Sequence, residues 1–223
     1  MYKNIFIIIS VLISNLSIAK VPVDGVVSIC SPYPIINDLT SFPEKFNLTN
    51  NLSHPRNDSF FDAEGEKIII HGRLMDSNCV PLSDAKIYIW QANKEGYVQY
   101  PRKTPNSFPN HKKWIDPNFS GTGITNSDNL GRFNFITIKP GSFTKVTPHI
   151  HFVVEHPKLP TLSSKFYFFD TKKSFIVDTD SNNKIFFIKN KSIINQVSAV
   201  LGDKPGNYTI EITMSDAIVG KGF

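Results

Sequence analysis

The stretch that decides the fold of this chain reads Thr147-Pro148-His149-Ile150-His151-Phe152-Val153-Val154. From His149 onward it is rich in β-branched and aromatic residues, which is typical of a strand. Side chains two residues apart leave the same face of a strand. His149 and His151 should therefore point together toward whatever covers that face, as two ligands of one metal ion would. Two hydrogen-bonded histidines on a half-polar strand face are the alternative interpretation.

Short apolar runs between turn residues continue on both sides of this stretch. We expect further strands at residues 67–74, 85–90, 131–137, 165–169, 184–189 and 208–214. Gly, Pro, Asn and Asp separate these runs, and no long stretch has a helical period. The pattern predicts an all-β fold, an antiparallel β-sandwich over residues 66–223. Residues 20–65 should form an irregular N-terminal arm, and residues 96–130 a long connection of the kind that often carries function.

The first 19 residues have the features of a secretory signal peptide. Lys3 is basic, an apolar run extends from Ile5 to Leu16, and Ser17-Ile18-Ala19 is a cleavage signal of small residues. Cleavage after Ala19 would leave a mature chain that begins at Lys20 and is exported, either to a periplasm or as a secreted protein. The run is shorter than the roughly 20 residues that cross a membrane. We therefore expect no stable span after cleavage, with an uncleaved anchor as the alternative.

The charge and the cysteines narrow the range of partners and compartments. The net charge is +5, and the basic residues are scattered. No basic run alternates with aromatic residues as in nucleic-acid grooves, so we expect no nucleic-acid partner. Cys30 and Cys79 would enter an oxidising compartment after export, which favours a disulfide between them. Two free thiols are the alternative.

Four segments between about residues 68 and 170 form an ordered series. They are Gly72-Arg73-Leu74-Met75-Asp76 with Val80-Pro81-Leu82-Ser83-Asp84-Ala85 and Ile89-Trp90-Gln91-Ala92-Asn93; Asp116-Pro117-Asn118-Phe119-Ser120-Gly121-Thr122-Gly123; Gly131-Arg132-Phe133-Asn134-Phe135-Ile136-Thr137-Ile138-Lys139-Pro140-Gly141; and Pro148-His149-Ile150-His151-Phe152. In this order and spacing the series resembles the intradiol ring-cleavage dioxygenases, especially the protocatechuate 3,4-dioxygenase β chains.

The resemblance implies a β-sandwich with one ferric iron bound by two tyrosinates and two histidines. His149 and His151 fall on the two histidine ligands of the family. Fe(III) is a hard ion that favours anionic oxygen donors, and imidazoles complete its ligand set. The implied cofactor is thus iron, as Fe3+ or alternatively Fe2+, and the implied substrates are a catechol-like aromatic compound and O2, as in aromatic catabolism. Family members often associate with a homologous chain, so a homo- or hetero-oligomer is left open.

The tyrosine ligands are where this sequence departs from the family. The position of the first family tyrosine holds Val98, with Tyr97 one residue earlier and Tyr100 two residues later. We expect Tyr97 or Tyr100 to supply the phenolate, and aromatic contacts within the loop are the alternative for both. The position of the second family tyrosine holds Phe143, which has no oxygen to offer iron.

Two further positions that the family uses in the reaction are also changed. Val146 stands in place of an arginine, and Lys165 in place of a glutamine. The leading interpretation is an exported non-haem iron dioxygenase of the intradiol type with an altered set of ligands. The second is a degenerate, non-catalytic domain of the same fold that binds metal or a partner. The third is another exported metal protein, such as a copper protein, whose further ligands would come from His54, His71, His111 or His156.

Overall fold

The structure is a computed structural model that describes residues 30–36, 42–53, 61–101, 115–142, 145–179 and 184–215. The expected signal peptide and its cleavage site lie outside these residues, as do Phe143, His54 and His111.

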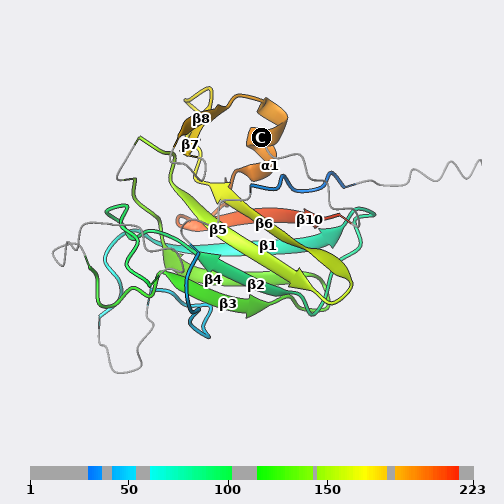
Figure 1. The fold of residues 1–223 in the computed structure, drawn as a ribbon, viewed down its shortest axis with the longest axis horizontal. Coiled ribbons are helices and arrows are strands. Elements are labelled where there is room, and N and C mark those ends of the chain that lie inside the picture. Colours follow the sequence, from blue (N-terminus) through cyan, green and yellow to red (C-terminus); the bar gives the residue numbers. More distant parts are fainter. Residues whose placement is uncertain are drawn as a thin grey trace, which may run out of the picture.

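The described chain folds into two facing four-stranded sheets, a two-stranded ribbon and one short helix (Figure 1). One sheet has the order β4-β1-β10-β9, built from β1 (Lys67–Asp76), β4 (Arg132–Ile138), β9 (Val200–Leu201) and β10 (Asn207–Met214). The other has the order β3-β2-β5-β6, built from β2 (Lys86–Trp90), β3 (Thr122–Asn126), β5 (His149–His156) and β6 (Leu159–Tyr167). The ribbon pairs β7 (Ile176–Thr179) with β8 (Ile185–Ile188), and α1 (Lys191–Val197) follows it. The predicted all-β sandwich is confirmed.

The core lies between the two sheets, where alternate residues of each strand meet. Ile68, Ile70 and Leu74 of β1 are buried there together with Ile150 and Phe152 of β5. Burying an aliphatic or aromatic side chain of this size contributes about 1.5–3 kcal/mol. The alternation of apolar residues that predicted the strands therefore reflects that every second side chain of a strand faces this core.

The structure shows why position 72, in the first of the four motif segments, holds a glycine. It pairs with Phe133 across β1 and β4, and a Cβ atom on Gly72 would lie 1.9 Å from Cζ of the Phe133 ring. Because no side chain fits under that ring, only glycine allows Phe133 to lie over its neighbour strand.

The structure differs from the expected pattern in a few elements. β1 and β10 pair in parallel, whereas all other strand pairs within the described sheets are antiparallel. The connection at residues 96–130 contains β3, a polar strand that pairs with β2. The helix α1 begins after Asn190, whose side chain accepts hydrogen bonds from two backbone amides, and is seven residues long. Within the described residues, no helix has the length and hydrophobicity needed to cross a membrane.

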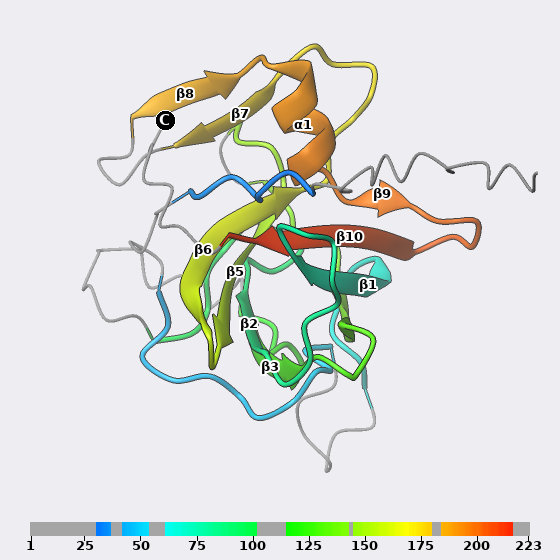
Figure 2. The same cartoon turned by 90° about the vertical axis from the view of Figure 1, so that its right-hand side faces the viewer.

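Residues 30–36 of the N-terminal arm close one side of the sandwich. The Tyr33 amide donates to the Thr213 carbonyl of β10 at 2.9 Å, and the Ile36 amide donates to the Ser163 carbonyl of β6 at 3.3 Å. The segment therefore forms backbone hydrogen bonds to both sheets. Figure 2 shows it in blue between α1 and the strands β6 and β10.

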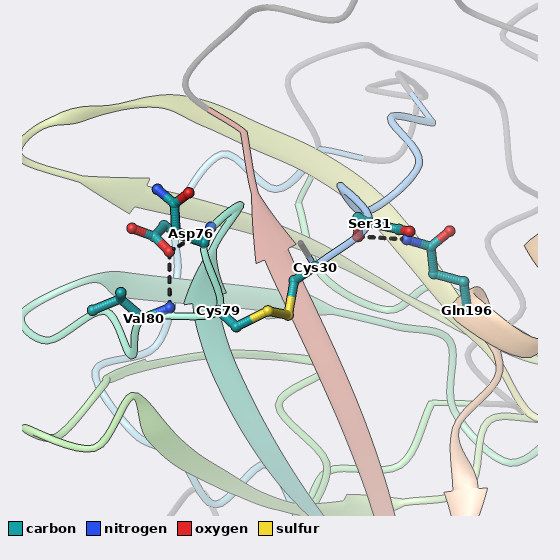
Figure 3. Close-up of a disulfide and its surroundings, with 7 residues drawn as sticks. Cys30, Ser31, Asp76, Cys79, Val80 and Gln196 are labelled. Carbon is teal, nitrogen blue, oxygen red and sulfur yellow. Dashed lines mark hydrogen bonds between the residues drawn. A yellow bond between two sulfur atoms is a disulfide. The ribbon is translucent and has the colours of Figure 1, made fainter. Parts of the chain in front are cut away.

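The predicted disulfide anchors this segment. Cys30 and Cys79 are bonded, with Cα atoms 5.3 Å apart, so the arm is tied to the turn between β1 and β2 (Figure 3). The Gln196 side chain of α1 donates to the Ser31 carbonyl at 2.9 Å on the other side of the segment (Figure 3). Of the two alternatives open in the sequence, the disulfide is confirmed.

Candidate metal centre

The outer face of the β3-β2-β5-β6 sheet carries the candidate metal ligands. Because side chains alternate along β5, His149, His151 and Val153 leave the face opposite to Ile150 and Phe152. Residues 42–47 of the arm lie over this face. The rings of Phe42 and Phe46 lie 5.2 and 5.9 Å from Trp90 of β2. The outer face at this point is therefore covered by protein, and His151 is only 7% exposed.

His149 and His151 are brought together as the sequence predicted. Their Nε2 atoms lie 3.2 Å apart, and Nδ1 of His149 lies 2.9 Å from the Thr147 carbonyl oxygen. A carbonyl only accepts, so Nδ1 of His149 carries the hydrogen and its Nε2 has the lone pair. A backbone carbonyl commonly fixes metal-binding histidines in this way.

The spacing of the two nitrogens suits a shared metal ion. Two imidazole nitrogens about 2.1 Å from one ion and at right angles to each other would lie about 3.0 Å apart. The 3.2 Å between the Nε2 atoms of His149 and His151 is close to that value. The pair therefore fits two neighbouring ligand positions on one ion. The same distance also fits a single hydrogen bond between the two rings, which is the alternative interpretation.

The surroundings of His151 keep its imidazole neutral. Its ring stacks on Trp90 with centroids 5.0 Å apart and planes inclined by 14°. Burial holds the pKa of His151 well below its ordinary value, and the Lys165 ammonium and the neighbouring His149 ring lower it further. A histidine must be neutral to bind a metal, so these surroundings favour its ligand form at neutral pH.

The two candidate tyrosines occupy different environments. Tyr97 is half-buried in a turn closed by Asn93, whose side-chain oxygen accepts from the Tyr97 amide at 3.0 Å. Tyr100 is buried in an aromatic cluster with Trp90 and Val153. Its ring lies so close over Gly121 that a Cβ atom there would approach it to 2.8 Å. The structure thus places Tyr100 in the same buried cluster as the indole on which His151 stacks, and Tyr97 at the start of the loop.

The loop that carries Tyr97 and Tyr100 is anchored by two of the motif segments, Trp-Gln-Ala-Asn at residues 90–93 and Lys-Pro-Gly at residues 139–141. The Gln91 side chain donates to the Ile138 carbonyl at 2.8 Å and accepts from the Thr137 hydroxyl at 2.9 Å. The Gly141 amide donates to the Asn93 carbonyl at 2.9 Å. The Trp-Gln-Ala-Asn and Lys-Pro-Gly segments therefore fix the residues from which the Tyr97–Tyr100 loop leaves the sheet.

The altered positions are only partly within the described residues. Val146 is half-buried, and its carbonyl accepts from the Ser142 hydroxyl at 2.6 Å. Lys165 is buried and forms an ion pair with Asp178, with Nζ 2.8 Å from Oδ2. Asp178 was not predicted from the sequence. The available signal was an aspartate directly after Ile176 and Val177, but the sequence does not show that it faces Lys165.

The two other histidines that the structure describes lie away from the pair. His71 is on β1 in the opposite sheet, and His156 ends β5 at the far end from His149. Within the described ranges, no group of three or more His, Cys, Asp or Glu side chains could hold a metal ion. A third, anionic protein ligand from the described part of the chain would therefore be a tyrosine.

Comparisons with known proteins identify the family and the fold of this chain. A family model described as "Dioxygenase" matches residues 42–200. A Rickettsia conorii protein that bears a provisional dioxygenase name is 37% identical over 134 residues, which are 59% of this chain and 62% of that protein. The match therefore spans less than two thirds of that relative. The protocatechuate 3,4-dioxygenase beta chain of Burkholderia cepacia is 38% identical over 79 residues, 35% of this chain and 31% of the relative.

A solved structure shares the fold. The intradiol ring-cleavage dioxygenase of Tetranychus urticae superposes with a TM-score of 0.60 at 19% identity, covering 84% of this chain and 96% of that one. At this identity the likeness concerns the sandwich and the order of its strands.

Proposed function

Because this chain belongs to the intradiol ring-cleavage dioxygenase family of oxidoreductases, we propose that it is an exported non-haem iron enzyme. The proposed reaction opens a catechol-like aromatic ring with O2. The observation that carries the proposal is the His149–His151 pair. Its Nε2 atoms converge at 3.2 Å on the covered outer face of the sheet, and the Thr147 carbonyl fixes one of them as a lone-pair donor.

His149 and His151 would hold the iron through their Nε2 atoms. Tyr100 is the favoured source of the phenolate oxygen, because it belongs to the same buried cluster as Trp90, which stacks on His151. Tyr97 is the alternative source. An imidazole pair and one phenolate give two neutral donors and one anionic oxygen, a set that suits iron and leaves positions for substrate oxygens.

Iron held by these residues would supply a site at which both catechol hydroxyls lose their protons, and the resulting catecholate ring is rich enough in electrons to react with O2. The protein's own residues supply the environment for that chemistry. Trp90 fixes the plane of His151 by stacking, and Phe42 and Phe46 cover the indole from the side of the arm. Excluding water in this way strengthens the electrostatic interactions at the site.

Export is supported by the disulfide and by the N-terminal sequence. A Cys30–Cys79 bond persists in oxidising compartments and is rare in the cytosol. The proposed location is therefore a periplasm or the exterior of the cell. N-terminal sequencing of exported protein tests it, because a chain that still begins at Met1 would contradict cleavage after Ala19.

The test of the function is metal content, visible spectrum and oxygen uptake of the purified protein, with His149→Ala as the paired variant. We expect about one iron per chain and a colour that arises from phenolate-to-iron charge transfer. Tyr100→Phe should remove that colour, whereas Tyr97→Phe should leave it. We expect uptake of O2 with catechols by the wild type and none by His149→Ala. An unchanged metal content in His149→Ala would assign the histidines a structural role.

A second candidate function is a degenerate, non-catalytic metal-binding or interaction domain. Val146 and Lys165 favour it, because one offers no charge and the other has its ammonium bound to Asp178. Losing a preorganised charge at a reacting centre commonly lowers a rate by about 10²–10³. The variant Phe143→Tyr with Val146→Arg decides between the two. Uptake of O2 that appears only in this variant would identify the natural chain as degenerate.

A further inference from the structure

A buried polar network lies on the same outer face as the histidine pair. Asp178 of β7 is at its centre, and its side chain is 0% exposed. Its Oδ2 accepts from the Lys165 ammonium at 2.8 Å and from the Tyr167 hydroxyl at 2.6 Å. Its Oδ1 accepts from the Thr179 amide at 2.8 Å. The Asp178 carboxylate thus accepts hydrogen bonds from three protein donors and is shielded from solvent.

The two side chains that Asp178 holds are the cross-strand neighbours of the candidate ligands. In the register of β5 and β6, Lys165 pairs with His151 and Tyr167 pairs with His149. Directly opposite residues of an antiparallel pair have Cβ atoms about 4.5–5.5 Å apart and leave the same face. The Tyr167 ring accordingly lies 5.6 Å from the His149 ring. Asp178 therefore fixes the side chains that border both imidazoles.

The same strand reaches His149 by a second route. The Thr147 amide donates to the Val177 carbonyl at 2.8 Å, and the Val177 amide donates to the Thr147 hydroxyl at 3.0 Å. The Thr147 carbonyl then accepts from Nδ1 of His149 at 2.9 Å. Val177 and Asp178 are adjacent in β7, so one short strand contacts the supports of both histidines.

Burying the Lys165–Asp178 ion pair costs free energy of hydration, which indicates that the network has a role other than stabilising the fold. A buried ion pair is commonly no more stabilising than well-packed apolar residues of the same volume, because both charges lose their hydration. Ligands of metal sites, in contrast, depend on outer hydrogen bonds, whose loss typically lowers metal affinity about 10–100-fold.

We propose that Asp178, together with Lys165 and Thr147, is a positioning residue of the metal centre, and that β7 is the element that fixes the directions of the His149 and His151 imidazoles. The inference rests on the proposed function, because it assumes that this pair binds iron. It assigns these residues no contact with substrate.

The deciding variant is Lys165→Met with Asp178→Asn in one full-length chain. It removes both charges, while the new amide can still accept from the Thr179 amide through its oxygen and donate to the Tyr167 hydroxyl through its nitrogen, so no buried charge is left uncompensated. The matched control is Arg132→Met with Asp128→Asn. That pair has the same 2.8 Å separation, but its side chains are 65% and 45% exposed and it lies at the start of β4.

Iron affinity is measured by competition with a chelator, and circular dichroism checks the fold. We expect about 10–100-fold weaker iron binding in the buried double variant, and unchanged binding in the surface control. The shape of the ferric electron paramagnetic resonance signal should change only in the former. Wild-type iron affinity and an unchanged signal in a folded double variant would overturn the positioning role while leaving the proposed function intact.

A second variant and a metal-free measurement keep the test decisive if the double variant does not fold. Thr147→Val keeps the shape of the side chain and removes the hydroxyl that binds Val177. Long-range proton–nitrogen NMR spectra of the metal-free wild type should show His149 as the Nδ1–H tautomer, and those of Thr147→Val a mixture. A single tautomer in both would overturn the inference. A wild type that takes up no iron would instead refute the proposed function, and the positioning role with it.

Discussion

The two faces of the β3-β2-β5-β6 sheet are made by alternate residues of the same strands, yet they are buried in opposite ways. On the inner face, Ile150, Phe152 and Val154 meet the other sheet in an apolar core. On the outer face, His149, His151 and Val153 alternate with them and are covered by the arm and by β7. The inner face needs only volume and hydrophobicity. The outer face needs a partner for every polar atom, because burial without a hydrogen bond is costly.

The largest expected effect is the contrast between two adjacent residues of β5, Phe152 on the inner face and His151 on the outer face. Phe152→Ala should lower the free energy of unfolding by about 3–5 kcal/mol, because it leaves a cavity in the core. A folded fraction of this variant should still bind iron. His151→Ala should give the reverse result, with a smaller loss of stability and no stable iron binding. Denaturant unfolding and metal analysis of both variants check the comparison. Loss of iron from folded Phe152→Ala would contradict the assignment of metal binding to the outer face alone.

Removing one member of the outer-face ion pair should be almost as severe. Lys165→Met leaves the Asp178 carboxylate buried without its cation, which should cost about 3–5 kcal/mol. Lys94→Met is the control. It breaks a 2.6 Å pair with Glu64 in which the side chains are 39% and 69% exposed, so no change in the unfolding midpoint is expected. Equal effects of the two changes would mean that burial does not distinguish the pairs.

Uncovering the outer face should have a moderate effect. The Phe46 ring packs edge-to-face on Tyr88 at 5.1 Å and on Trp90 at 5.9 Å, and such aromatic contacts are worth about 0.5–1.5 kcal/mol each. Phe46→Ala should lower the melting temperature slightly and expose the indole. Faster quenching of tryptophan fluorescence by acrylamide, relative to Leu48→Ala at an exposed position of the same segment, measures the exposure. Identical quenching would contradict the covering role of the arm.

The smallest expected effect is a pH dependence at the rim of the outer face. Burial, together with the 2.9 Å hydrogen bond to Glu155, raises the pKa of Tyr88 from 10.0 to about 12. The folded state therefore holds this proton more tightly than the unfolded state. Its contribution is fully present below pH 10 and is lost as the pH rises toward 12. In Tyr88→Phe that part of the alkaline loss of stability should disappear, and identical wild-type and variant curves from pH 9 to 12 would refute it.

The same comparison explains how much the sequence could predict. Alternation around His149 and His151 predicted a strand with both imidazoles on one face, and the cysteines predicted their disulfide; both follow from local spacing or from a small number of candidates. The polar strand β3 was missed because Thr122–Asn126 has no apolar alternation. The Lys165–Asp178 pair was missed because it depends on where the β7 ribbon folds back, which no local pattern encodes. Which tyrosine serves the pair stays a prediction for the same reason.

The parallel pairing of β1 with β10 has a consequence for the synthesis of the chain. The first strand of the sandwich lies between β4 and the last strand, and residues Ile69 and Asn207 are register partners. Contacts between such distant residues form slowly, because a long loop must close before they are gained. During translation, β1 therefore cannot pair with β10 until the ribosome has synthesised the chain to Met214. The β4-β1-β10-β9 sheet therefore cannot be completed before β10 has left the ribosome, and β1 has only β4 as a strand partner until then.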